Sequence, residues 1–296
     1  MKKTTIFRGT GVAIVTPMKK DGSVNFDKYR ELIEWQIENG TDAIITCGTT
    51  GESSTLSHEE HTEAIKTAIE QAKGRVPVIA GTGSNDTSYC IELSQEAKRL
   101  GTDALLLVTP YYNKTSQRGL IAHYNKVADA VRMPIILYNV PSRTGVDIKP
   151  TTCAELAKSP YIVAVKEASG NMSAVLHTAA LCGDSLDLYS GNDDQIVPVL
   201  ALGGKGVISV MSNILPKKTD DICEKWFAGD FDGSLALQKE LADLAAALFS
   251  DVNPIPVKEA MNLMGMEVGE CRMPLIGMDD AGRDALAAVL RRHGLI

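Results

Sequence analysis

The chain has 296 residues, of which 44% are hydrophobic and 23% are charged, and its formal net charge is −7. This length fits one large α/β barrel, and the composition is ordinary for a globular protein. The acidic balance argues against a nucleic-acid partner, which would normally face a basic surface, and no run approaches the roughly 18 to 20 apolar residues of a membrane helix.

The first residues, MKKTTIFRGTGVAIVTP, predict a strand and not a targeting segment. Two lysines precede an apolar stretch, as in a signal peptide, but Arg8, Gly9 and Gly11 interrupt that stretch. Six cysteines are spread along the chain without a CxxC pair. This spacing favours reduced, mostly buried thiols over disulfides or a zinc site. We therefore expect a cytoplasmic protein with no metal site and no membrane or nucleic-acid partner.

Short β-branched runs alternate with longer stretches of helical periodicity over most of the chain. The predicted strands are 12–16, 43–47, 76–80, 104–109, 135–139, 162–166, 186–190 and 207–210. Predicted helices between the first five strands are 26–39, 58–73, 87–100 and 118–131. Strands that are apolar throughout are typical of parallel strands buried on both faces. The alternation predicts a closed (β/α)8 barrel, the TIM-barrel fold, in preference to an open doubly wound sheet.

After the eighth predicted strand the alternation stops and only helices follow. Their predicted ranges are 234–249, 256–264 and 279–292, and the segment DVNPIP is the expected joint. We interpret residues 1–225 as the barrel and residues 226–296 as a C-terminal helical extension.

In a (β/α)8 barrel, functional groups gather in the loops that follow the carboxyl ends of the strands. From the second strand onward these loops contain CGTTGES, GTGSND, TPYYNK, YNVPSRTG, KEASG, SGNDD and SVMSN. Together they bring hydroxyl groups, glycines, Arg143, Lys166 and three tyrosines to one rim. This rim is the predicted functional face.

Several of these motifs allow two interpretations. Thr49 and Thr50, flanked by glycines, expose backbone N–H groups and hydroxyls that can hold a carboxylate. The same loop also leads into a helix with Ser57 as its cap and Glu60 completing a capping box. The tyrosines are either aromatic packing or a proton chain. Arg143 is either a surface arginine or a guanidinium that donates two hydrogen bonds to a substrate carboxylate.

Lys166 stands inside the otherwise apolar run IVAVKEASG. A lysine at the end of a strand can lay its stem on apolar surface and extend its ammonium into water. It is also the best nucleophile on the rim, because burial makes the neutral amine accessible and such an amine attacks ketones. The neighbouring Glu167 should point to the opposite face and be structural. Motifs for a zinc protease, a dinucleotide fingerprint and a P-loop fail on spacing.

Four linked motifs, GTTGES, TPYYN, YNVPSRTG and VKEASG, resemble those of the class I pyruvate-dependent aldolases and lyases. Within that superfamily the chain is most similar, over nearly its whole length, to the dihydrodipicolinate synthase (4-hydroxy-tetrahydrodipicolinate synthase) family. The same scaffold hosts N-acetylneuraminate lyase and 2-keto-3-deoxy sugar-acid aldolases, which match YNVPSRTG less well around Arg143. A barrel that binds a keto acid without catalysis is the alternative from another class of protein.

The resemblance implies condensation of pyruvate with L-aspartate 4-semialdehyde on the route to diaminopimelate and lysine, with no metal or organic cofactor. It implies a Schiff base on Lys166 and a pyruvate anchor and proton donor at Tyr138. It also implies a relay in which Thr49 links Tyr138 to Tyr112, with Tyr112 reaching into the neighbouring subunit's site. The implied substrate-binding residues are Thr50 for the pyruvate carboxylate, Arg143 for the other substrate's carboxylate, and Gly191 and Ile208 in the pocket wall. The implied assembly is a homotetramer, a dimer of dimers.

Many members of this family are inhibited by lysine at the dimer interface. The matching residues here are Ser53, Ser54, His58, His61, Asn85 and Tyr111, with Tyr89 at a further position. Lysine-sensitive enzymes carry a glutamate where this chain has Tyr89, and a phenol cannot replace that negative charge. We therefore expect weak or absent lysine feedback.

Overall fold

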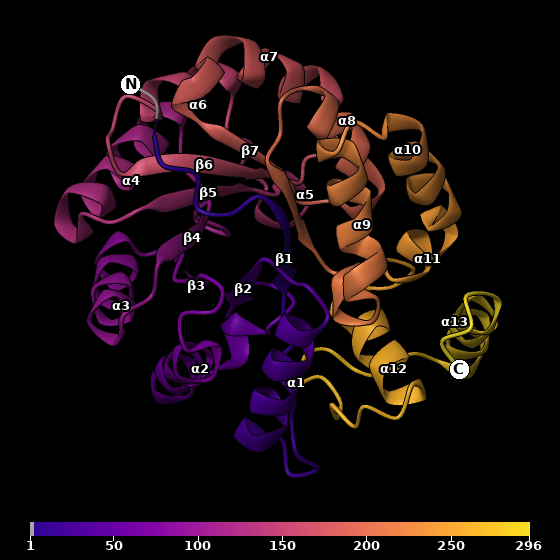
Figure 1. Cartoon of the computed structure of the whole chain (residues 1–296). Helices are drawn as coiled ribbons and strands as arrows, with labels where there is room; N and C mark the ends of the chain where they lie inside the picture. The colour runs from indigo at the N-terminus through magenta and orange to yellow at the C-terminus, as the bar shows by residue number, and fades with distance from the viewer. Residues whose placement is uncertain (1–2) are drawn as a thin grey trace.

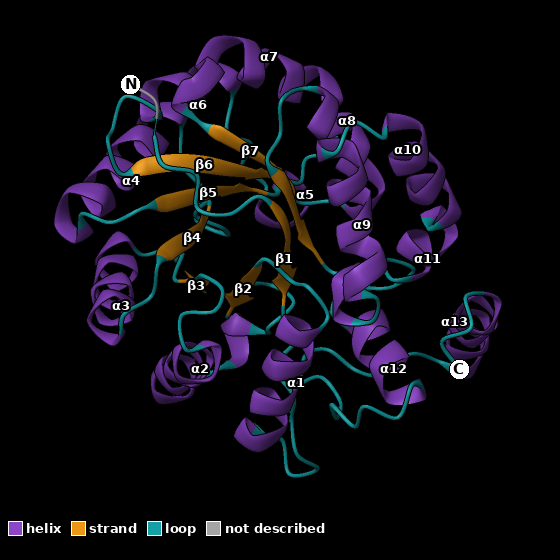
Figure 2. Ribbon diagram, viewed as in Figure 1, coloured by secondary structure: helices purple, strands orange, loops and turns teal. Residues whose placement is uncertain are grey.

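The computed structural model describes residues 3–296, and its eight strands close into a parallel barrel in chain order. The strands are β1 (Gly9–Ala13), β2 (Ala43–Thr46), β3 (Val78–Gly81), β4 (Ala104–Val108), β5 (Ile135–Asn139), β6 (Ile162–Glu167), β7 (Asp187–Ser190) and β8 (Gly206–Ser209). Figures 1 and 2 show the strands at the centre and the helices around them. The predicted (β/α)8 barrel is confirmed.

Helices follow the strands around the outside of the barrel. They are α1 (Phe26–Glu38), α2 (His58–Ala72), α3 (Thr87–Leu100), α4 (Gln117–Val131), α5 (Pro141–Thr144), α6 (Pro150–Leu156), α7 (Met172–Cys182), α8 (Ile196–Ala201) and α9 (Pro216–Phe227). Short 3-10 turns η1 (Ser53–Thr55), η2 (Gly183–Ser185), η3 (Asp193–Gln195) and η4 (Met211–Asn213) complete the rim and connections. The predicted capping box of α2 is present, because Ser57 and Glu60 bond reciprocally.

The first strand begins three residues before the predicted 12–16 and ends at Ala13. Its amino-terminal half holds Gly9 and Gly11, which carry no apolar signal. Glycine is nevertheless required there, because a Cβ on Gly9 would lie 2.0 Å from Asp42 Oδ2, and a Cβ on Gly206, its partner on β8, would lie 1.8 Å from the Gly9 carbonyl oxygen. Close approach of two backbones explains why periodicity alone misplaced this strand.

The C-terminal extension consists of α10 (Phe231–Glu240), α11 (Ala242–Ala247), α12 (Ile255–Leu263) and α13 (Asp280–Arg292). The single helix predicted for 234–249 is wrong, because the chain breaks at Leu241, whose φ of −91° and ψ of 2° leave the helical region. In Figure 1, α12 lies between α1 and α11, and α13 is at the edge of the molecule. The division at residue 225 falls inside α9 and stays a prediction.

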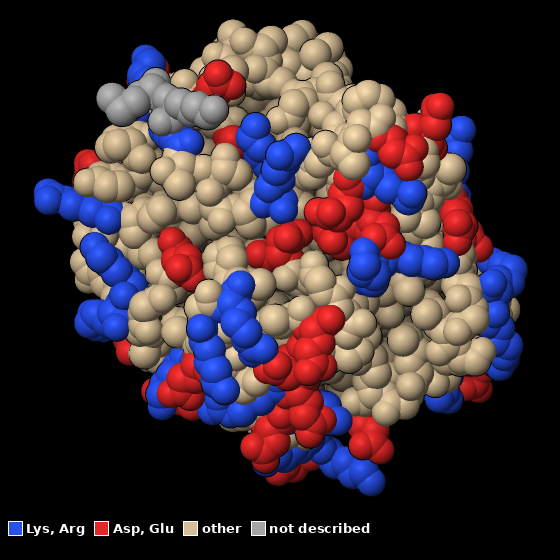
Figure 3. Space-filling model, in the orientation of Figure 1, with Lys and Arg blue, Asp and Glu red and all other residues tan. Residues whose placement is uncertain are grey.

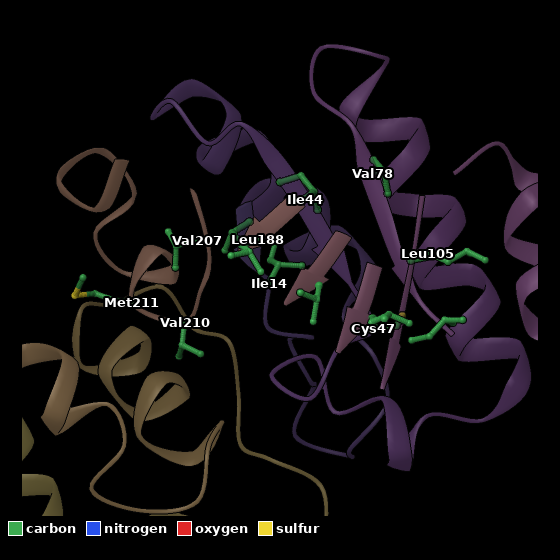
Figure 4. Close-up of a cluster of buried hydrophobic side chains, with 14 of the residues drawn as sticks. Ile14, Ile44, Cys47, Val78, Leu105, Leu188, Val207, Val210 and Met211 are labelled. Carbon is green, nitrogen blue, oxygen red and sulfur yellow. The ribbon is translucent and has the colours of Figure 1, made fainter. Parts of the chain in front are cut away.

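Two apolar layers hold the barrel together. The larger lies between the strands and the helices, and Figure 4 shows part of it, including Ile44 of β2, Leu188 of β7 and Val207 of β8. The smaller fills the barrel interior. Because side chains alternate along a strand, the outward Val165 of β6 leaves its neighbour Lys166 facing inward. This alternation positions the predicted nucleophile.

Candidate active site

Lys166 extends from β6 into the barrel interior and is 5% exposed. It is opposite Tyr138 of β5 in the parallel register, and its Nζ lies 4.3 Å from the centre of the Tyr138 ring. Tyr138 is buried with apolar side chains of the interior, among them Ile208 of β8. An ammonium over an aromatic face at this distance is attracted by the ring. The structure therefore brings Lys166 and Tyr138 together, with Ile208 in the same interior cluster, and the roles of the three residues stay predictions.

The lack of a side chain at Gly191 leaves room for the Lys166 side chain. A Cβ at Gly191 would lie 3.2 Å from Lys166 Cε and 2.7 Å from the Cβ of Ala168. The Gly191 N–H donates to the Glu167 carbonyl oxygen at 2.7 Å, which holds the loop after β7 against the end of β6. A side chain at this position would push against the lysine stem, so glycine is required by packing.

Glu167 faces the other side of β6, as predicted. Its carboxylate accepts from Asn139 Nδ2 at 3.0 Å and from the Ser169 backbone N–H at 2.7 Å. Burial raises the pKa of the Glu167 carboxyl. These bonds tie the ends of β5 and β6 together and support a structural role.

The threonine loop begins where β2 ends. Cys47 has a φ of 54°, which turns the chain sharply. The turn packs against Gly81, where a Cβ would lie 2.2 Å from the Cys47 carbonyl oxygen. Thr50 is buried, and Thr49 and Tyr138 line one cavity of about 40 Å³. The structure thus places the Thr49 side of the loop beside Tyr138.

Arg143 lies on α5 at the same rim, and its Nη2 donates to the Asn253 carbonyl oxygen at 3.2 Å. Tyr112 does not join the other residues within this chain. It is 92% exposed with a φ of 69°. Its predicted role in a neighbouring subunit's site stays a prediction.

A cavity of about 420 Å³ lies at the same rim. Thr49 and Arg143 line it together with five of the predicted regulatory residues, which are Ser53, Ser54, His61, Tyr89 and Tyr111. The other two contact this set: His58 Nδ1 lies 3.3 Å from the Tyr89 hydroxyl, and Asn85 Nδ2 donates to the Tyr111 carbonyl oxygen at 3.1 Å. Residues predicted for catalysis and for regulation therefore share one crevice.

Three residues beside the site were missed by sequence reasoning. Asn253 contacts Arg143 and Thr50. Asp193 is buried in the loop after β7 and accepts from the Met211 backbone N–H at 2.9 Å, and burial raises the pKa of its carboxyl. Lys258 Nζ lies 2.8 Å from Glu52 Oε1 with both side chains 2% exposed. The motif SGNDD, in the loop after a predicted strand, could have indicated Asp193. No neighbouring residue in the sequence indicates that Thr50 or Glu52 contacts the C-terminal extension.

Within residues 3–296, no group of three or more His, Cys, Asp and Glu side chains is arranged to hold a metal ion. None of the helices in the same range is long and apolar enough to cross a membrane.

Comparisons with known proteins agree on one family. A model described as the dihydrodipicolinate synthetase family matches residues 6–293. A 4-hydroxy-tetrahydrodipicolinate synthase of Lachnoclostridium phytofermentans is 58% identical over 98% of this chain and 99% of its own length.

Solved structures give the same result. A chloride-inhibited dihydrodipicolinate synthase of Acinetobacter baumannii in complex with pyruvate is 46% identical, with a TM-score of 0.96 over 99% of this chain and 100% of its own. The enzyme of Cyanidioschyzon merolae with lysine bound is 38% identical, with a TM-score of 0.96 over 99% and 100% of the two chains.

Proposed function

The chain belongs to the dihydrodipicolinate synthetase family, and from this membership and the rim geometry we propose that it catalyses the 4-hydroxy-tetrahydrodipicolinate synthase reaction. The substrates are pyruvate and L-aspartate 4-semialdehyde, and the product serves diaminopimelate and lysine biosynthesis. The observation that carries the proposal is the buried Lys166, which faces the barrel interior beside Tyr138. A lysine in an apolar wall has little structural reason to be there, because lysine is rarely buried without a function or a partner.

The reaction begins with attack of the Lys166 amine on the ketone carbon of pyruvate. Loss of water gives a protonated Schiff base, which withdraws electrons from the adjacent methyl carbon. That carbon then loses a proton and becomes the nucleophilic carbon of an enamine. Tyr138 anchors the pyruvate-derived part and exchanges these protons, with Thr49 as the link to Tyr112 of a neighbouring subunit.

The enamine carbon attacks the aldehyde carbon of the second substrate, a new C–C bond forms, and the aldehyde oxygen takes up a proton. The amino group of the same substrate then attacks the imine carbon. The Lys166 amine leaves, and the ring closes. Thr50 and its loop hold the pyruvate carboxylate, and Arg143 holds the carboxylate of the second substrate as a charge-assisted fork.

The Schiff base itself is the electron sink, so the proposal includes no metal or organic cofactor. Dialysis against EDTA should leave the rate unchanged, and a loss that added metal restores would contradict this part. The cytoplasmic location stays a prediction.

We propose a homotetramer for the assembly. Leu176 and Leu181 on α7 are 50% and 55% exposed, and α7 contains no charged residue. Figure 3 shows the surface over α7 free of Lys, Arg, Asp and Glu. An uncharged helix face with exposed leucines is typical of a protein interface. Light scattering coupled to size exclusion should give four chains, and a monomer at assay concentration would contradict the assembly.

The function is tested by borohydride reduction in the presence of pyruvate, followed by peptide mass analysis. The reduced adduct should lie on Lys166 and be absent from Lys166→Met. An unmodified Lys166 in the active preparation would refute the Schiff-base mechanism, and a barrel that only binds a keto acid would give that result.

Substrate choice separates the synthase from other aldolases on this scaffold. Turnover should be faster with L-aspartate 4-semialdehyde than with N-acetylmannosamine or glyceraldehyde. Arg143→Ala should cripple this condensation and leave pyruvate trapping intact. Preference for a sugar aldehyde, or full activity of the variant, would favour the sugar-acid aldolase alternative.

A further inference from the structure

Asn253 connects the C-terminal extension to both proposed carboxylate-binding groups. It precedes α12 and is 5% exposed. Its Nδ2 donates to Thr50 Oγ1 at 3.0 Å across 203 positions of sequence, and its carbonyl oxygen accepts from Arg143 Nη2 at 3.2 Å. One residue of the extension thus contacts the groups that would bind each substrate.

Asn253 also lines a cavity at the rim. This cavity, of about 420 Å³, is the one that Thr49 and Arg143 line. A bond to a main-chain carbonyl fixes one arm of the Arg143 guanidinium and leaves its other N–H groups for a ligand. Because Arg143 is exposed on the short helix α5, this bond restricts the side chain to the edge of the cavity.

In the bond between Asn253 and Thr50, the amide donates and the hydroxyl oxygen accepts. A hydroxyl has one hydrogen to donate and two lone pairs to accept with. When the Asn253 amide donates to one lone pair, the Thr50 hydrogen remains free to donate to a substrate carboxylate. An acceptor at position 253 would have the opposite effect, because it would take that hydrogen.

Fold stability alone does not explain why an asparagine occupies position 253. Its Oδ1 is buried and has no hydrogen-bond donor among residues 3–296. A buried polar atom without a partner destabilises a fold, and such atoms call for an explanation other than packing.

We propose that Asn253 is a positioning residue for pyruvate binding: its side-chain amide orients the Thr50 hydroxyl toward the pyruvate carboxylate, while its main-chain carbonyl holds Arg143 in place. This inference rests on the proposed function. It makes the extension part of the substrate-binding machinery, although the extension supplies no group that reacts.

Steady-state kinetics of two variants and one control test the proposal. Asn253→Ala removes the amide donor to Thr50 and should raise KM for pyruvate about tenfold, the usual effect of one lost hydrogen bond to a charged system. KM for the second substrate should change by less than about threefold, because the main-chain carbonyl that accepts from Arg143 is kept in the variant. Asn253→Asp, which keeps the shape but accepts the Thr50 hydrogen and repels carboxylates, should raise KM for pyruvate roughly a hundredfold. In both variants kcat should stay within about threefold, because the chemistry at Lys166 is unaltered.

Asn262→Ala is the matched control. Asn262 lies on α12 and bonds Gly269 and Val268 at 3.0 and 2.8 Å, away from the cavity. The control should lower stability with little change in KM. An equal rise in KM in the control, or unchanged KM in folded Asn253→Asp, would overturn the proposal.

A double-mutant cycle that combines a substitution at Asn253 with Thr50→Val gives a second readout. If Asn253→Ala folds poorly, the cycle can be run with Asn253→Asp instead. The two effects on KM for pyruvate should be less than additive if Asn253 acts through Thr50, and full additivity would argue against it. Failure of pyruvate trapping in the unaltered protein would refute the proposed function instead, so the two failures are distinguishable.

Discussion

The Nζ of Lys166 lies 4.3 Å from the centre of the Tyr138 ring, and the two residues are opposite each other on adjacent strands. The Lys166 Nζ packs over the ring face, and the phenol on the same ring supplies a proton donor and acceptor. Packing and proton transfer are therefore separable at Tyr138, because phenylalanine keeps the first and removes the second.

Tyr138→Phe should lower kcat by about 10²- to 10⁴-fold, the usual contribution of a general acid–base group, and still form a trapped pyruvate adduct. The control is Tyr124→Phe, which removes a buried hydroxyl that bonds the Leu107 carbonyl oxygen outside the barrel interior. That control should keep its kcat. A Tyr138→Phe enzyme with normal kcat would exclude the phenol from proton transfer.

Gly191→Ala should displace the lysine stem, because the new Cβ would lie 2.7 Å from Ala168 Cβ and 3.2 Å from Lys166 Cε. We expect a loss on the order of 10²-fold in kcat/KM, as for a misplaced reacting group, together with slower trapping of pyruvate. Gly277→Ala is the control, since a Cβ there meets nothing within 4 Å. Trapping at the normal rate in Gly191→Ala would refute the packing argument.

Lys258→Met should lower the free energy of unfolding by about 3–5 kcal/mol, because it leaves the Glu52 carboxylate buried without its ion pair. Urea unfolding measures this. Adding Glu52→Gln should recover part of the loss, since the uncompensated charge is then gone. Lys158→Met, which breaks an exposed pair with Glu155, should change stability by less than about 1 kcal/mol. Equal effects of the two lysine variants would contradict the role of burial.

Asp220 and Asp42 both lie beside Gly9 at the amino-terminal end of the barrel, and burial together with the Asp42 charge raises the pKa of Asp220 to about 8. The folded protein therefore holds a proton that an unfolded aspartate releases near pH 4. Binding of this proton therefore adds to the free energy of unfolding. The added stability should be fully present below pH 4 and should be lost as the pH rises to about 8.

Asp220→Asn should flatten that dependence and be the more stable protein at pH 8.5 in urea unfolding. Burial lowers the pKa values of His61 and His123, so these two histidines reduce the free energy of unfolding as the pH falls below 6.5. They do so in both proteins, and their contribution cancels when the variant is compared with the unaltered protein. An unchanged slope in the variant would contradict the assignment.

Lysine should inhibit weakly or not at all, because the phenol of Tyr89 stands beside His58 where a carboxylate is needed for an α-amino group. Tyr89→Glu should increase inhibition by lysine, and Tyr89→Gln, without the charge, should not. Titration of the initial rate with lysine measures both. Inhibition of the unaltered protein at micromolar lysine would refute the expectation.

Much of this fold follows from local patterns. Strands β5 and β6 begin where β-branched runs begin, and the alternation around Val165 already turns Lys166 inward, because period and burial are properties of neighbouring residues. The helix break at Leu241 and the glycines of β1 were missed, because a cap and a close backbone approach carry little apolar signal.

Residue patterns alone were enough to predict the barrel, its functional rim and the lysine on that rim. The closed fold was needed to show that Asn253 bonds Thr50 and Arg143, that Lys258 neutralises Glu52, and that Tyr112 is exposed. The reason is physical: hydrophobic periodicity records which face of an element is buried, whereas a contact across some 200 residues exists only after the barrel has closed and the extension has packed across it.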